Sequence, residues 1–186
     1  MNDLSMLEVW LVTGSQHLYG EETLQQVASD ARIIAGYLND SAAIPVKIIY
    51  QPVVTTPEEI TQTIRAANQH KLCIGIIAWM HTFSPAKMWI TGLKHLQKPL
   101  LHLHTQFHRD IPWSDINMDY MNLHQSAHGD REFGFILARM RLQHKIVTGH
   151  WKEHTVQHGI GAWCRAAAGW NDWQEARFCR FGDNMR

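Results

Sequence analysis

The sequence of 186 residues has no excess of charge of either sign and no long apolar run. Seventeen Lys and Arg residues balance seventeen Asp and Glu residues. The chain therefore has no overall basic field that would attract nucleic acid or an anionic membrane. No apolar run approaches the ~20 residues that span a bilayer. The first ten residues also lack the basic start and apolar core of a secretory signal. We expect neither a nucleic-acid partner nor a membrane partner.

Cysteines and phosphate-binding motifs are scarce as well. The three cysteines, Cys73, Cys164 and Cys179, lie far apart and are odd in number, which favours neither a disulfide framework nor a zinc knuckle. The expected compartment is the reducing cytoplasm. The loop after the first predicted strand reads G-S-Q-H-L-Y-G rather than G-x-G-x-x-G, and no G-x-x-x-x-G-K-[ST] occurs. Both absences count against a flavodoxin-like or other nucleotide binder.

What the sequence does contain is an alternation of strand and helix patterns. Strands are predicted at 8–14, 45–53, 72–80, 98–105, 144–150 and 175–184. Helices are predicted at 21–38, 57–68, 85–96 and 151–169, with two further helical pieces over 117–143 that join near Gly129. This order predicts an α/β fold: a doubly wound, mostly parallel sheet with helices on both faces, of Rossmann or flavodoxin-like type.

Local signals at helix starts support this reading. Thr56, Pro57 and Glu59 form the pattern of a capping box with proline at the first helical position. Ser84 and Pro85 repeat the cap-plus-proline pattern before the third helix. The length fits one domain, and we expect it to span residues 1–178. Residues 179–186 are interpreted as the start of a connection to a further domain.

The ligand crevice of such a sheet lies outside the carboxyl ends of its strands. The segments that follow the predicted strands are rich in Gln, His, Phe and Trp, in a chain that has thirteen His and eight Trp residues. They read GSQHLYG, MHTFSP, HTQFH, GHW and FGDN. Amides and imidazoles pair with hydroxyl groups, and aromatic faces cover the apolar side of a sugar. The pattern therefore favours a polyhydroxylated ligand.

No self-sufficient catalytic or metal-binding set is visible. His102 and His104 alternate along a strand and share a face, while His124 and His128 stand four residues apart, as two ligands on one helix do. Neither pair has a carboxylate or thiolate at ligand spacing, so histidines that line a pocket or interface are the favoured interpretation. Ser15 lies outside a G-x-S-x-G elbow.

Six motifs make the sequence similar to the amino-terminal part of the bacterial L-arabinose isomerase family. They are VTGSQHLYG, WMHTFSPAKMWI, KPLLHLHTQF, MDYMNLHQSAHGDREFGFI, VTGHW and CRFGDNMR. The resemblance extends from about residue 8 to residue 186. It implies an amino-terminal Rossmann-like domain of a much longer polypeptide. It also implies a trimer or hexamer that converts L-arabinose to L-ribulose. It further implies Mn²⁺ held by two Glu and two His of later domains, so that neither metal ligands nor catalytic residues are expected in this chain.

The same resemblance implies a set of substrate-binding residues that complete the active site of a neighbouring subunit. They are Gln16, Leu18, Tyr19, Phe83, Gln125, His128 and Met185. His17 has no role in this set and is left unassigned, with support of its loop as the one alternative considered. An alternative hypothesis is a free-standing, non-catalytic module for sugar binding or oligomerisation.

Overall fold

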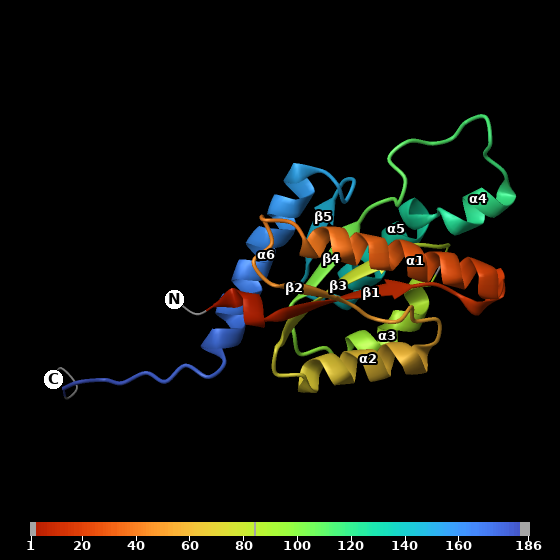
Figure 1. The fold of residues 1–186 in the computed structure, drawn as a ribbon. Helices are drawn as coiled ribbons and strands as arrows, with labels where there is room; N and C mark the ends of the chain where they lie inside the picture. Colours follow the sequence, from red (N-terminus) through yellow and green to blue (C-terminus); the bar gives the residue numbers. More distant parts are fainter. Residues whose placement is uncertain (1–2, 84, 183–186) are drawn as a thin grey trace.

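The computed structural model describes residues 3–83 and 85–182. Five parallel strands form one sheet in the order β2-β1-β3-β4-β5 (Figure 1). The strands are β1 (Glu8–Gly14), β2 (Lys47–Tyr50), β3 (Cys73–Met80), β4 (Leu100–His104) and β5 (Lys145–Thr148). The α-helices are α1 (Gly20–Asn39), α2 (Pro57–Gln69), α3 (Trp89–Leu93), α4 (Met118–Leu123), α5 (Ser126–Met140) and α6 (His154–Trp173). The predicted doubly wound α/β fold is confirmed.

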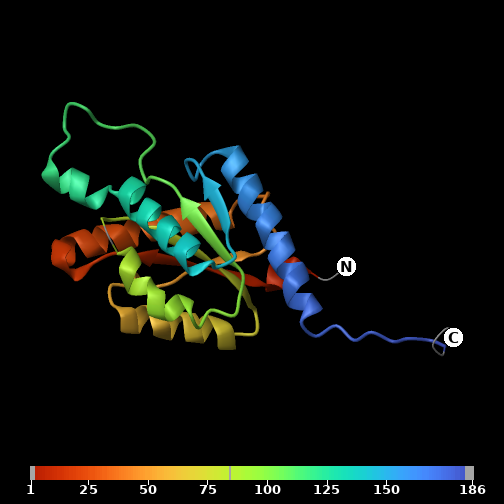
Figure 2. The same ribbon diagram turned by 180° about the vertical axis from the view of Figure 1, so that it is seen from behind.

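Two hydrophobic clusters lie on opposite faces of the sheet. One cluster joins the sheet to α1 and α6, through residues such as Ile34 and Ile160. The other joins it to α2, α3 and α5, through Ile64, Trp89 and Phe133. The view from behind shows α5 on the same side as α2 and α3 (Figure 2). Burial on both faces explains why β3 is apolar along its whole length.

The start of α2 follows the predicted capping box. Thr56 Oγ1 accepts a hydrogen bond from the Glu59 amide, and the Thr56 amide donates one to Glu59 Oε2. Glu59 also accepts a bond from the amide of Thr55 at 2.7 Å. The predicted cap at Ser84 lies outside the described residues. The segment after it forms a 3₁₀ turn at Ala86–Met88 and then the five-residue helix α3, shorter than predicted.

Two predictions about the second half of the chain are wrong. The break between the two helical pieces falls at His124 and Gln125 rather than at Gly129, which lies inside α5. A Cβ at Gly129 would collide with the carbonyl oxygen of Thr82, so the glycine allows α5 to approach the end of β3. The described part of the predicted sixth strand, residues 175–182, contains no strand.

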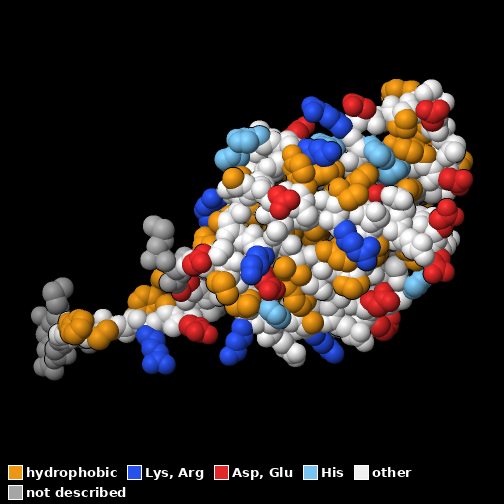
Figure 3. Space-filling view, viewed as in Figure 1, with side chains coloured by type: hydrophobic (Ala, Val, Ile, Leu, Met, Phe, Trp, Pro, Cys, Tyr) orange, Lys and Arg blue, Asp and Glu red, His pale blue; other side chains and the backbone are white. Residues whose placement is uncertain are grey.

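The segment after α6 extends away from the body of the molecule. Hydrophobic side chains lie along it in the space-filling view (Figure 3). Phe178 is 77% exposed and Phe181 is 93% exposed. Among the described helices, none is long and apolar enough to cross a membrane.

Candidate functional site

The strand order reverses direction between β1 and β3, which makes their carboxyl ends the switch point of the sheet. The loop after β1 and the loop after β3 meet there. Ser15 Oγ and Thr82 Oγ1 lie 3.0 Å apart, and both side chains are buried. This hydrogen bond joins the two loops below the surface, so the residues that follow each of them are held side by side.

Above this bond, Gln16 and Tyr19 reach from the first loop to the second. Gln16 Nε2 donates to the carbonyl oxygen of Phe83 at 2.7 Å, and Tyr19 Oη donates to the same oxygen at 3.1 Å. Burial raises the pKa of the Tyr19 phenol, so it remains a hydrogen-bond donor at neutral pH. The Phe83 ring contacts His128 with ring centroids 4.2 Å apart. The structure therefore brings together Gln16, Tyr19, Phe83 and His128.

The other residues of the predicted substrate-binding set differ in their placement. Gln125 immediately precedes α5, and its carbonyl oxygen accepts bonds from the amides of His128 and Gly129. Leu18 is 71% exposed and projects from the first loop. Met185 lies outside the described residues.

His17, which the sequence left unassigned, supports its loop. Its Nε2 lies 2.7 Å from Thr55 Oγ1, and the same hydroxyl lies 2.9 Å from Glu59 Oε2. The loop after β1 is thereby tied to the first turn of α2. The loop after β1 is therefore held at two places: by α2 through His17, and by the loop after β3 through Gln16 and Tyr19.

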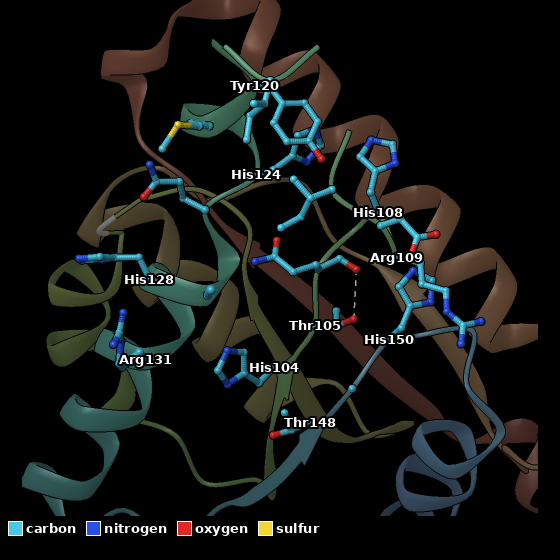
Figure 4. A pocket seen from close by; sticks show the side chains of 18 of the residues that line it. His104, Thr105, His108, Arg109, Tyr120, His124, His128, Arg131, Thr148 and His150 are labelled. Carbon is cyan, nitrogen blue, oxygen red and sulfur yellow. Dashed lines mark hydrogen bonds between the residues drawn. The ribbon is translucent and has the colours of Figure 1, made fainter. Parts of the chain in front are cut away.

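A cavity of about 850 Å³ opens beside this cluster, at the carboxyl ends of β4 and β5 (Figure 4). His104, Thr105 and Thr148 come from the strand ends, whereas His128 and Arg131 project from α5 on one side. The remaining labelled residues of the wall are His108, Arg109, Tyr120, His124 and His150. The volume is ample for a monosaccharide, because small-ligand pockets typically measure about 300–1,000 Å³.

Two histidines of the wall are electrically neutral at pH 7. Burial lowers the pKa of His124 to about 4, and the neighbouring His81 and His108 lower it further. Burial also lowers the pKa of His104, with a contribution from Arg131. A neutral imidazole offers one donor and one acceptor nitrogen, which suits a hydroxyl group that also donates and accepts.

Sequence reasoning found part of this wall. The segment HTQFH was identified as a strand-end loop, and it contributes His104, Thr105 and His108. Tyr120 and Arg131 were not singled out, because their helical segments do not directly follow a strand. Only the packing of α4 and α5 against the strand ends places them at the cavity.

The two histidine pairs considered from the sequence behave differently. His102 and His104 share a face, with stacked rings whose centroids lie 5.8 Å apart. His124 and His128 do not share a helix, since His124 ends α4 and His128 lies in α5. The favoured interpretation is confirmed instead, because His124 and His128 both line the cavity.

The described residues do not fit the manganese site that the resemblance implies. That site needs two Glu and two His, and no such group occurs within 3–83 and 85–182. The one group of three potential ligands found in these residues is Asp30, His81 and His124. It contains a single carboxylate and differs from the implied set.

Comparisons with known proteins agree with this architecture. Residues 3–175 match the family model described as the L-arabinose isomerase N-terminal domain. The chain is 62% identical over 186 residues to an L-arabinose isomerase of Herpetosiphon aurantiacus. It is 58% identical to those of Koribacter versatilis and of Flavobacterium johnsoniae. Each alignment covers 100% of this chain and 37% of the relative, so the chain spans little more than a third of their length. The chain therefore belongs to the family of L-arabinose isomerase N-terminal domains.

Proposed function

We propose that this chain acts as the substrate-positioning domain of an L-arabinose isomerase, a cytoplasmic enzyme in which it completes the active site of a neighbouring subunit. The observation that carries the proposal is the cluster of Gln16, Tyr19, Phe83 and His128 beside the cavity. The family membership supplies the sugar, L-arabinose or a similar aldose. The assembly in which this occurs is a trimer or hexamer.

The conversion of L-arabinose to L-ribulose moves hydrogen from C2 to C1 of the open-chain sugar through an enediol. The residues of this chain act by holding the sugar hydroxyls while a base elsewhere moves the proton. Gln16 and His128 provide amide and imidazole groups for that purpose, and the Phe83 ring covers an apolar edge of the sugar. Positioning of this kind contributes through orientation, and a shift of about 1 Å can cost roughly 100-fold in rate.

A domain replacement tests the proposal. The chain is substituted for the matched segment of the Herpetosiphon aurantiacus relative, and L-ribulose formation from L-arabinose is measured with Mn²⁺ present. We expect the chimera to be active and the 186-residue chain alone to form no L-ribulose above background. Activity of the chain alone would show that the chemistry does not need residues outside it. An inactive, folded chimera would overturn the proposal, and sugar binding by the chain alone would then favour the non-catalytic module.

Point variants of the chimera test the positioning roles. We expect Gln16→Ala and His128→Ala to lower kcat/KM by about 10- to 100-fold with an unchanged metal content. Gln25→Ala on α1 and His158→Ala on α6 are matched controls, because both side chains are exposed and lie outside the cluster. Wild-type kinetics in both test variants, or loss of the metal in either, would remove these residues from the proposed role.

A further inference from the structure

Three potential metal ligands from separate parts of the chain converge behind the cavity. Asp30 comes from α1, His81 directly follows β3, and His124 ends α4. One ligand atom from each lies within 4.8 Å of the other two. Asp30 and His81 are fully buried, and His124 is half-buried where it also lines the cavity.

Hydrogen bonds engage both carboxylate oxygens of Asp30 and one nitrogen of His81, but they leave one nitrogen of each histidine without a partner. His81 Nε2 lies 2.8 Å from Asp30 Oδ2, and Gln26 Nε2 donates to the other carboxylate oxygen at 2.8 Å. Nδ1 of His81 and Nδ1 of His124 are both buried without a hydrogen-bond partner. A buried polar nitrogen without a partner is costly, because the water that it loses is not replaced. His81 and His124 thus each keep one buried nitrogen that no hydrogen bond satisfies, which points to a ligand at this group.

The chemistry of the set selects the kind of ligand. Two imidazoles and one carboxylate are the donors that zinc and similar divalent transition metals accept, and three protein ligands leave a fourth position open. Ligand atoms at about 2.1 Å from a tetrahedral ion lie roughly 3.4 Å apart. Asp30 Oδ2 and His81 Nε2 lie 2.8 Å apart, so a bound ion would separate these two atoms and draw in the half-buried His124.

We propose that Asp30, His81 and His124 bind one divalent transition-metal ion of the zinc class. The ion joins α1, the end of β3 and α4, and its open position faces the cavity that His124 lines. It thereby fixes α4 and the 106–117 loop that precedes it, which together form one wall of the cavity. This inference goes beyond the proposed function and does not rest on it.

The test starts from a background variant, because the surface offers competing ligands. His154 and His158 form an exposed pair on α6 with their Nε2 atoms 2.8 Å apart, and Cys179 is an exposed thiol. The background therefore carries His154→Ala, His158→Ala and Cys179→Ser. Calorimetry with Zn²⁺ and absorption spectra with Co²⁺ measure binding to the whole chain. We expect one equivalent of either ion and the intense visible bands of four-coordinate Co²⁺.

Substitution of the proposed ligands tests whether the ion binds at this group. We expect His124→Asn and Asp30→Asn each to weaken Zn²⁺ binding by more than the roughly 10- to 100-fold that loss of an outer-shell partner costs. His150→Asn is the matched control, since His150 lines the same cavity outside the group and should leave binding unchanged. No bound ion in the background variant, or full affinity in the folded His124→Asn variant, would overturn the proposal. His124 is half-buried, so this variant is expected to fold even if Asp30→Asn does not.

Proteolysis provides a second readout that does not depend on activity. Arg109 lies exposed in the loop before α4, so trypsin can cut there. We expect Zn²⁺ to slow cleavage after Arg109 in the background variant and to have no effect in His124→Asn. An equal rate with and without Zn²⁺ in the background variant would contradict the role of the ion in fixing this loop.

Discussion

Two buried aspartate–histidine pairs lie at the same sheet, and they differ in what surrounds them. In the first, His81 contacts Asp30 at 2.8 Å. In the second, His102 contacts Asp130 at 2.9 Å. Asp130 Oδ1 also accepts a bond from the Met80 amide at 3.0 Å, whereas Asp30 receives its additional bond from the exposed Gln26. The Asp130 carboxylate binds a backbone amide in the interior, whereas the Asp30 pair lies next to His124 and the cavity.

The two aspartate–histidine pairs have different structural surroundings. The Asp130 pair lies under α5, where the His102 ring packs edge-on against the buried Phe133 with centroids 5.1 Å apart. It attaches α5 to β3 and β4 in the interior. Both pairs have a further imidazole beside them: His104 stacks on His102 with centroids 5.8 Å apart, and His124 lies beside His81 with centroids 5.5 Å apart. Among the described residues, only Asp30, His81 and His124 bring three potential ligand atoms within 4.8 Å of one another.

The largest expected effect comes from breaking the Asp130 pair. Asp130→Ala removes the acceptor of the Met80 amide and of His102, and it leaves both donors in a place that water does not reach. We expect the free energy of unfolding to fall by about 2–6 kcal/mol, because two buried donors are left unsatisfied at about 1–3 kcal/mol each. Urea denaturation followed by circular dichroism measures this. A loss below about 1 kcal/mol would mean that the pair does not fasten α5.

Breaking the Asp30 pair should cost less in the absence of metal. Asp30→Ala leaves His81 without its partner, but Gln26 is exposed and regains its hydrogen bonds from water. We expect a loss of about 1–3 kcal/mol by the same measurement, the usual cost of one unsatisfied buried group. A larger loss than that of Asp130→Ala would reverse the comparison of the two pairs.

A smaller effect, of opposite sign, is expected beside the Asp130 pair. A Cβ at Gly134 in α5 would lie 3.6 Å from His102 Cε1, which is ordinary van der Waals contact. Gly134→Ala should therefore stabilise the protein by about 0.5–1 kcal/mol, because alanine favours the helix over glycine. Thermal unfolding compares it with Gly129→Ala, which we expect to be destabilising through the collision with Thr82. Destabilisation by Gly134→Ala would show that His102 has no room for the added methyl group.

The smallest effect concerns protonation of His102. Burial lowers the pKa of this imidazole to about 3, so its ring resonances should stay constant from pH 8 to pH 5 in an NMR titration. Because an unfolded histidine binds a proton near pH 6.5, the contribution of His102 to stability falls as the pH drops from about 6.5 towards 3. The pKa of Asp130 is raised by burial, which acts in the opposite sense. For this reason the ring signal, rather than the melting temperature, is the measurement. A His102 titration centred above pH 5 would contradict the buried, neutral state.

Much of the fold was predictable because its signals are local. The first strand occupies residues 8–14 as expected, and Thr56 with Glu59 marked the start of α2. The predicted strand over 175–184 was wrong in its described part, 175–182, because a strand needs a neighbour for its hydrogen bonds. The apolar residues Phe178 and Phe181 are exposed, and no strand pairs with this segment over its described residues, 175–182. Gly129 was interpreted as a break between helices. It lies inside α5 instead, where the absence of a side chain allows α5 to pack closely against Thr82.

The candidate site was predictable in part. The resemblance identified Gln16, Tyr19, Phe83 and His128, which the fold brings into contact, although their role towards a sugar stays a prediction. The group of Asp30, His81 and His124 was not predicted. No spacing in the sequence relates these three positions, because they come from α1, the end of β3 and the end of α4.

The sequence by itself determined the family, the alternation of strands and helices, and the edge of the sheet at which polar and aromatic side chains gather. These follow from local periodicity, capping signals and long contiguous motifs. The tertiary structure alone decided which histidines are sealed in the interior and which border the cavity. Whether a histidine is buried or lies at the cavity depends on contacts between elements that are far apart in the sequence. Local sequence patterns contain no information about such contacts. His102 and His124 are alike as residue types, and only the packing of α5 over one and the end of α4 at the other distinguishes them.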